Sequence, residues 1–257
     1  MGKIGYVDGE FNGNLFQWLV FELKAVFNNK AAIGIWLFGV GFQLANLLAN
    51  PINWVSIMTF GATVVGLLCT VAMMTGNSIN GLLGAVSVFG FCVVNSVAGH
   101  WWSILDQLVF LFLIDAPLVK NWKTWGADFG KKVRTLNSKG WFTAIVGIVL
   151  FWALLYPIGV ALHDTAPFID AGVLAIGAVA SILCYLHYNN AYTLWMISNL
   201  INVVLWIQTA MTQGINGTTV AMLVSTLMYM STAIYGRFFS PWAAGNDNKQ
   251  SGIANKM

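Results

Sequence analysis

The sequence predicts an all-α membrane protein that crosses the bilayer about eight times. Hydrophobic residues make up 58% of the 257 residues and charged residues only 8%, whereas soluble domains carry roughly 25% charged residues. Mean hydropathy is +0.73, and the apolar residues form long runs, unlike the short alternating segments of a membrane β-barrel. Too few charges remain to cover a soluble surface, which excludes a cytosolic enzyme, a nucleic-acid-binding protein and a disordered chain.

Eight runs approach the length of ~20 residues that a helix needs to cross the hydrocarbon core. They lie near residues 31–49, 52–75, 78–98, 101–119, 141–162, 168–187, 190–212 and 217–239. Before the first run, residues 15–27 mix apolar side chains with Gln17, Glu22 and Lys24. This mixture favours a helix that lies in the membrane interface, although an extension of the first span fits the same residues.

The 12 basic residues test this count of spans. All of them fall before the first span, between the fourth and fifth spans, or at and after the end of the last span. With eight crossings these three segments share one side of the membrane, and the positive-inside rule makes that side cytoplasmic, with both termini. The basic residues between Lys120 and Lys139 fit an ordinary topogenic loop better than a patch for lipid headgroups or a partner.

The spans are predicted to follow a 3+1+3 plan. Residues 1–50 form an interfacial segment and a peripheral membrane helix, and residues 51–119 form a first three-helix repeat. Residues 120–162 form the basic cytoplasmic loop and a linker helix, and residues 163–242 form a second repeat parallel to the first. Parallel repeats of this kind are known in transporters, including SWEET-type carriers. Residues 243–257 are polar and are predicted to be a disordered tail.

Three predicted spans carry polar and aromatic residues at helical spacing, which places each set on one face. The sets are Asn80, Gly84, Ser87, Phe91 and Asn95; Ser103, Asp106, Gln107 and Phe110; and Asn189, Tyr192, Trp195, Asn199, Asn202 and Trp206. Such stripes also hold helices together, and that interpretation suits Asn80, Asn95 and Asn202 equally well. Rings that alternate with amides favour a binding site in the seventh span, because rings stack on a flat ligand and amides pair with its hydroxyls.

The acidic residue Asp106 admits two interpretations. It either meets a cationic ligand or a coupling proton inside the membrane, or it reaches water near the outer end of its span. The sequence has no H-E-x-x-H, Cys-x-x-Cys or phosphate-binding-loop motif, so no metal, no cofactor and no ATP hydrolysis are predicted. No Lys or Arg lies in the interior of a predicted span, which disfavours solutes that carry phosphate.

Several short motifs resemble those of the PnuC-type nicotinamide riboside transporters. Residues 188–199 are similar to that family's W-x-x-W…N region, residues 76–84 and 105–110 to motifs of its first triplet, and residues 233–242 to its last span. The resemblance covers roughly residues 50 to 242. Tyr192 stands where the family usually has its first Trp and Gln107 where Asn is frequent, and Trp206 and Phe110 replace tyrosines, so the substrate preference within the family stays open.

The resemblance implies a SWEET-like homotrimer in the inner membrane of a bacterium, and facilitated diffusion of nicotinamide riboside with trapping by a separate cytoplasmic kinase. Membrane lipids are the other expected partners, and no nucleic acid is expected. The candidate substrate-binding residues are Asn80, Phe91, Asp106, Gln107, Tyr188, Asn189, Tyr192, Trp195 and Asn199. Three alternatives remain: a carrier of thiamine, riboflavin, a deoxynucleoside or a sugar; a membrane-embedded enzyme; and a structural scaffold.

Overall fold

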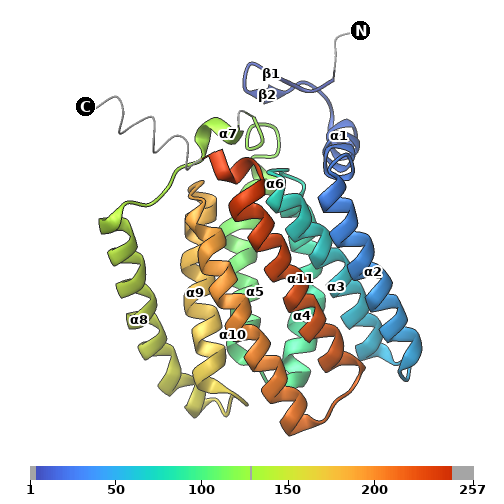
Figure 1. The fold of residues 1–257 in the computed structure, drawn as a ribbon, viewed down its shortest axis with the longest axis vertical. Coiled ribbons are helices and arrows are strands. Elements are labelled where there is room, and N and C mark those ends of the chain that lie inside the picture. Colours follow the sequence, from blue (N-terminus) through green and yellow to red (C-terminus); the bar gives the residue numbers. More distant parts are fainter. Residues whose placement is uncertain (1–3, 128, 245–257) are drawn as a thin grey trace.

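The computed structural model describes residues 4–127 and 129–244, and these form an almost entirely helical bundle (Figure 1). Eight of its helical runs are long and apolar enough to cross a membrane, so the predicted spans are confirmed. They are α2 (Lys30–Ala49), α3 (Trp54–Met74), α4 (Asn80–Ala98), the run from α5 to α6 (Trp101–Lys120), α8 (Ser138–Ala161), α9 (Pro167–Tyr185), α10 (Asn190–Gln213) and α11 (Gly217–Phe239). The chain is a multi-pass membrane protein.

Four spans begin directly after an asparagine whose side chain caps the helix. The residues are Asn29, Asn53, Asn137 and Asn216, and each side chain accepts a hydrogen bond from a backbone N–H of the first turn. A cap of this kind satisfies a donor that the helix itself leaves free, which fixes the point where the helix starts. These caps explain why helix boundaries fall close to the ends of the apolar runs.

The six helices α3, α4, α5, α9, α10 and α11 surround the centre of the bundle. Neighbours along the chain pack together within α3–α5 and within α9–α11, and the two groups meet where α5 packs on α9 and where α11 packs on α3. Helix α8 packs on α9, and α2 packs on α3 and α11, so both lie at the edge of the bundle (Figure 1). The repeat relation between the two groups, and the domain boundaries drawn from it, stay predictions.

The fourth span is not a continuous α-helix. A π-helical turn (Leu111–Asp115) joins α5 (Trp101–Phe110) to α6 (Ala116–Lys120), and within it the N–H of Ala116 donates to the carbonyl of Leu111. Pro117 accounts for the irregularity, because it has no N–H to donate to the carbonyl four residues earlier. The sequence analysis did not anticipate this turn.

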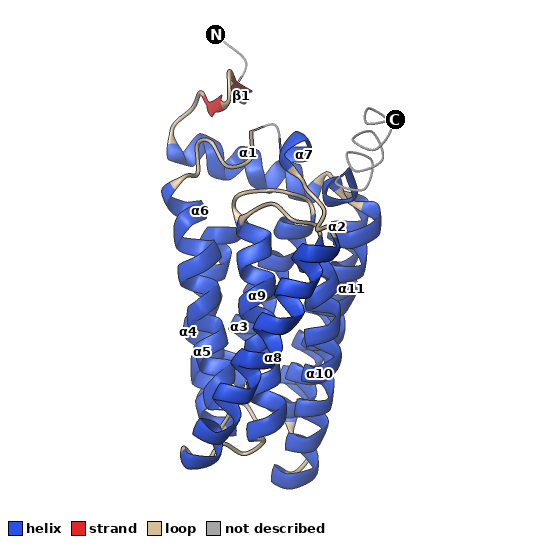
Figure 2. Cartoon of the chain, turned by 90° about the vertical axis from the view of Figure 1, so that its left-hand side faces the viewer, coloured by secondary structure: helices blue, strands red, loops and turns tan. Residues whose placement is uncertain are grey.

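The N-terminal segment lies across one end of the bundle (Figure 2). Helix α1 (Leu15–Phe27) ends before Asn28 and Asn29, so it is a separate helix and does not extend the first span. A hairpin of β1 (Tyr6–Val7) and β2 (Glu10–Phe11), which was not predicted, precedes it. Its turn is Asp8-Gly9, both with positive φ, a dipeptide that favours tight hairpin turns. The buried Glu22 fixes α1 in place by accepting from the Tyr6 hydroxyl (3.0 Å) and the Ile79 N–H (3.2 Å), and burial raises the pKa of this carboxyl.

The basic loop between the fourth and fifth spans is folded onto the same end of the bundle. It contains the short helix α7 (Phe129–Lys132), and it buries Trp125, Phe129, Val133 and Leu136. A short 3-10 turn (Pro241–Ala243) adds the buried Trp242, whose ring lies 4.7 Å from that of Phe129. The loop therefore has a packed aromatic core in addition to its charges. The sequence places the start of a disordered tail at residue 243, which is wrong for Ala243 and Ala244, because they belong to the 3-10 turn and its end. The rest of the predicted tail, from residue 245 onward, lies outside the described residues.

All the described basic residues belong to elements at this end of the bundle, which we call the basic end. They are Lys24, Lys30, Lys120, Lys123, Lys132, Arg134, Lys139 and Arg237. Figure 1 shows α1, α7 and both ends of the described chain there. The loops at the opposite end, which we call the far end, contain no Lys or Arg. Because the number of spans is even, the described basic residues all lie at one end of the bundle, as the sequence predicts.

Candidate functional site

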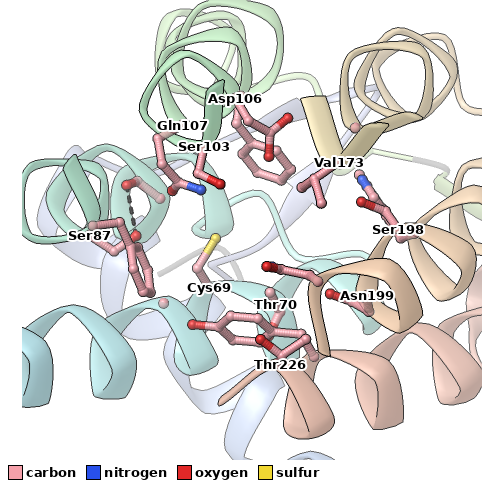
Figure 3. A pocket seen from close by; sticks show the side chains of 18 of the residues that line it. Cys69, Thr70, Ser87, Ser103, Asp106, Gln107, Val173, Ser198, Asn199 and Thr226 are labelled. Carbon is pink, nitrogen blue, oxygen red and sulfur yellow. Dashed lines mark hydrogen bonds between the residues drawn. The ribbon is translucent and has the colours of Figure 1, made fainter. Parts of the chain in front are cut away.

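A central cavity lies among the six inner helices. Figure 3 shows side chains from α3 (Cys69, Thr70), α4 (Ser87), α5 (Ser103, Asp106, Gln107), α9 (Val173), α10 (Ser198, Asn199) and α11 (Thr226) around it. Because both three-helix groups contribute, the cavity exists only where they meet. A cavity inside a helix bundle suits a small molecule rather than a macromolecular ligand.

The lining combines aromatic rings with neutral polar groups and two carboxylates. The rings are Phe91, Phe110, Tyr192, Trp195, Trp206 and Tyr229, the amides are Asn95, Gln107, Asn199 and Asn202, and the carboxylates are Asp106 and Asp115. No Lys, Arg or His is among the described residues that line it. Any fixed charge on the described lining is therefore negative.

Two aromatic groups form parts of the wall. In the first group, the Trp195 ring lies 5.9 Å from Phe110 at 39° and 5.2 Å from Tyr192 at 87°. In the second group, Phe91 and Tyr229 are 6.4 Å apart at 76°. Gly236 makes room for the first group, because a Cβ there would collide with the ring of Tyr192. Flat ligands stack on faces of this kind.

Several buried polar atoms of the lining have no hydrogen-bond partner within the described part of the chain. They are Oδ1 of Asp106, both carboxylate oxygens of Asp115, Oδ1 of Asn202 and the hydroxyls of Tyr192 and Tyr229. Buried polar groups are nearly always paired with protein, water or ligand. Six such atoms around one cavity indicate that a polar molecule completes their hydrogen bonds.

At the far end, Trp206 lines both this cavity and a second one among the far ends of α3, α4, α10 and α11. His100 holds Trp206 edge-on at 5.3 Å, and its own ring nitrogens lie 2.8 Å from the Thr209 hydroxyl and 3.0 Å from the Thr165 hydroxyl. Burial lowers the pKa of His100 to about 4, so the ring is neutral at pH 7.

At the basic end, a column of aromatic rings starts at Tyr192 in the cavity lining. Tyr192 contacts Trp242 (5.1 Å), Trp242 contacts Phe129 (4.7 Å), and Phe129 contacts Trp125 (5.0 Å). The Trp242 indole N–H donates to the carbonyl of Met73 over 2.9 Å, which ties the column to α3. Aromatic side chains thus lie toward both ends of the bundle from the cavity.

One buried group has side chains of the types that bind metals. Ligand atoms of His100, Asp164 and Asp170 lie within 4.8 Å of one another. The two carboxylates, however, already accept hydrogen bonds from the backbone at the start of α5. Asp164 accepts from the N–H of Trp101 (2.9 Å), and Asp170 accepts from the N–H of Trp102 (2.9 Å) and from the Ser103 hydroxyl. The two carboxylates therefore cap the start of α5, Asp170 from α9 and Asp164 from the loop before α9. Because these hydrogen bonds already satisfy the carboxylates, the group needs no metal ion.

Residues 56–243 match the profile of the family described as "Nicotinamide mononucleotide transporter". The chain belongs to this family. Two relatives are named nicotinamide riboside transporter PnuC. The protein from Neisseria mucosa is 24% identical over 234 residues, covering 85% of this chain and 83% of its own, and the protein from Haemophilus influenzae is 24% identical over 176 residues, covering 65% and 74%. The crystal structure of the vitamin B3 transporter PnuC shares the fold, with a TM-score of 0.74 at 21% identity over 91% of this chain and 99% of that one.

The predicted resemblance to PnuC-type proteins is confirmed, and membership places the chain among transporters rather than enzymes. Six of the nine predicted binding residues line the cavity of this transporter: Phe91, Asp106, Gln107, Tyr192, Trp195 and Asn199. The interpretation of Asp106 as a carboxylate that simply reaches water does not fit its place on the wall, where its Oδ1 is buried without a partner among the described residues.

The other three predicted residues lie outside the lining, nearer the basic end. The Asn80 amide donates to the Asn77 carbonyl (2.8 Å), and Asn189 accepts from the Thr135 hydroxyl (3.1 Å). The Tyr188 ring lies 4.5 Å from the Arg134 guanidinium. Helix α10 starts at Asn190, so Tyr188 and Asn189 precede it and the helical face does not continue to them.

The sequence analysis did not include several lining residues in the site. On α11, Met222, Thr226, Tyr229 and Ala233 line the cavity at intervals of four, three and four, which is a helical spacing that was readable from the sequence. On α3, Gly66, Cys69, Thr70 and Met73 do the same. In the sequence, most of these side chains look like ordinary helix-packing residues. Only the position of the cavity in the structure separates them from such residues.

Proposed function

We propose that this family member carries nicotinamide riboside across the cytoplasmic membrane of a bacterium. The observation that supports it most is the lining of the central cavity, with aromatic faces, amides and carboxylates and no basic side chain among its described residues. Nicotinamide riboside has a flat cationic ring, a carboxamide and a ribose, and it lacks phosphate. Each of these groups has a suitable partner in the lining.

We assign the ring to the wall formed by Trp195 and Phe110. A cation over an indole face is worth ~2 kcal/mol when both are desolvated. The amides of Gln107, Asn199 and Asn202 both donate and accept, which suits the carboxamide and the ribose hydroxyls. The proposed binding set consists of these residues with Phe91, Tyr192 and Asp106, and it leaves out the three residues that lie nearer the basic end.

The family description names a mononucleotide, whereas the two relatives are named for the riboside. The cavity favours the riboside. A phosphate on the mononucleotide would be buried with no cation to pair with, and it would lie in the same space as two carboxylates. An unpaired buried anion costs several kcal/mol.

The path is proposed to run from the far end to the basic end, with the basic end in the cytoplasm by the positive-inside rule. Trp206 and the column at Trp242 would open alternately around the fixed cavity, as in carriers built from two helix groups. The family resemblance implies facilitated diffusion, with a separate kinase that would trap the solute by phosphorylation, and we propose this mechanism. The proposed homotrimer rests on the family resemblance alone.

Uptake into proteoliposomes tests the proposal. Vesicles that contain the purified protein should accumulate labelled nicotinamide riboside to equilibrium without ATP, and excess unlabelled riboside should compete. Thiamine, riboflavin, deoxynucleosides and sugars serve as rival competitors. If one of these blocks uptake at lower concentration than the riboside, the substrate assignment is wrong. Equal label in vesicles with and without protein would contradict the transport of this solute altogether.

A further inference from the structure

We propose that Asp115 is the residue by which the cavity selects a positively charged solute. This inference rests on the proposed function, since it concerns the recognition of the same solute. Asp115 was not in the predicted binding set. The proposal stands on its burial, its lack of partners, the helix irregularity that positions it and the space that α4 leaves for it.

Asp115 is a buried carboxylate with nothing to balance it. Its exposed fraction is 0%, it lines the cavity, and neither of its oxygens has a hydrogen-bond partner among the described residues. Carboxylates in protein interiors are otherwise paired with a cation or with hydrogen-bond donors, because an isolated buried charge is strongly disfavoured. The two carboxylates that cap α5, Asp164 and Asp170, show the usual arrangement in this same protein, with several donors each.

The π-helical turn determines where Asp115 points. At 100° per residue, a regular α-helix would place Asp115, nine positions after Asp106, about 180° from it on the helix surface. The turn from Leu111 to Asp115 takes in one extra residue, which leaves the two carboxylates roughly 80° apart. Both then line the cavity with Phe110. Turns of this kind inside helices occur frequently at functional sites.

Helix α4 leaves room for the carboxylate. A Cβ at Gly84 would collide with the Asp115 carboxylate, and a Cβ at Gly81 would lie 2.8 Å from its backbone oxygen. A glycine offers the carboxylate no side-chain donor. Helix α4 therefore makes room for the Asp115 carboxylate without offering it a hydrogen-bond donor at Gly84.

The other titratable groups of the lining do not supply a positive charge. They are Cys69 on α3, Asp106 on α5, and Tyr192 and Tyr229 on α10 and α11. Cys184 on α9 is buried nearby. None of these groups becomes a cation at any pH. No described group of the lining can balance an ionised Asp115, so its counter-charge would arrive with the occupant of the cavity, and the pyridinium of nicotinamide riboside provides one.

The two carboxylates differ in a way that assigns this role to Asp115. Asp106 is half-buried, and only one of its oxygens is both buried and unpartnered. Asp115 is fully buried, and both oxygens lack partners. Electrostatic interactions are stronger where water is excluded. Charge selection should therefore depend more on Asp115 than on Asp106.

The test compares nicotinamide riboside with its reduced dihydro form, which has nearly the same shape but no charge. Isothermal titration calorimetry on the full-length protein in detergent measures both affinities for the wild type and for Asp115→Asn, which is isosteric and neutral. We expect the variant to bind nicotinamide riboside at least tenfold more weakly and to bind the reduced form within about threefold of the wild type. Asp106→Asn should have a smaller effect, and the exposed Glu10→Gln is the control.

The outcomes separate this inference from the proposed function. If the wild type does not bind nicotinamide riboside, the proposed function is wrong. If the wild type binds it and Asp115→Asn binds it equally well, charge selection by Asp115 is wrong and the function stands. If Asp115→Asn unfolds at the wild-type temperature but binds neither ligand, the inference is also contradicted, because binding of the neutral ligand should not depend on the charge of Asp115. If the variant does not fold, a wild type that binds both ligands equally contradicts it.

Discussion

Trp195 offers the most direct perturbation of the proposed ring-binding wall. Its indole is half-buried on α10, contacts Phe110 and Tyr192, and faces the cavity. Trp195→Ala removes the face on which the cationic ring is proposed to stack, and it leaves the carboxylates and amides in place. A desolvated cation–aromatic contact of ~2 kcal/mol corresponds to roughly 30-fold in affinity. We therefore expect the dissociation constant for nicotinamide riboside to rise tenfold to about 30-fold.

Calorimetry of the purified variants measures this change. Trp54→Ala is the matched control, because Trp54 is 63% exposed at the start of α3 and lies outside the cavity. Trp195→Phe retains a ring and should recover much of the affinity that alanine loses. If Trp195→Ala elutes and unfolds like the wild type and binds with unchanged affinity, the ring only packs against its neighbours and the stacking assignment is wrong.

Three further predictions concern closure, pH and topology. Trp206→Ala should join the central cavity to the far-end cavity, so a cysteine reagent should modify the buried Cys69 faster in this variant than in the wild type. Equal rates of modification would show that Trp206 is not the barrier between the two cavities. In the folded protein the pKa of His100 is lowered to about 4 from 6.5, so as the pH falls the unfolded state binds a proton before the folded state does. The contribution of His100 to the free energy of unfolding should be complete above pH 6.5 and should fall by up to about 1.4 kcal/mol per pH unit down to about pH 4. An equally steep fall in the apparent Tm of His100→Asn would refute this cause. In intact cells, an impermeant thiol reagent should label Ile215→Cys, which replaces a residue 83% exposed in a far-end loop, and should not label Lys139→Cys; the reverse pattern would invert the orientation.

The number of spans could be predicted from the sequence because the bilayer imposes a length on each apolar run and the basic residues constrain the parity. The asparagines before several runs act locally, within three residues, so they also mark helix starts. The separation of α1 from α2 at Asn28–Asn29 was left open, because amphipathic and membrane-spanning residues join there without a Pro or Gly. The fold of the basic loop was missed, since its aromatic core packs on residues far along the chain, such as His187 and Trp242.

The binding face of the seventh span could be predicted because an aromatic and amide stripe has a simple period of helical turns. That period includes Asn189, but Asn189 precedes α10 and lies outside the cavity lining. The role of Asp115 could not be predicted. Ordinary helical spacing sets it opposite Asp106, and the π-helical turn that moves it depends on how Pro117 is accommodated in the folded bundle.

The central claim is that this cavity takes a cationic riboside without phosphate, and the affinities of nicotinamide riboside and its mononucleotide test it most directly. Both ligands are titrated into the same preparation of the wild-type protein in detergent by calorimetry. A buried phosphate with no cation in the described lining should weaken binding by ~3 kcal/mol or more, which corresponds to over a hundredfold. The account predicts that the riboside binds more than a hundredfold tighter, and equal or tighter binding of the mononucleotide would contradict it.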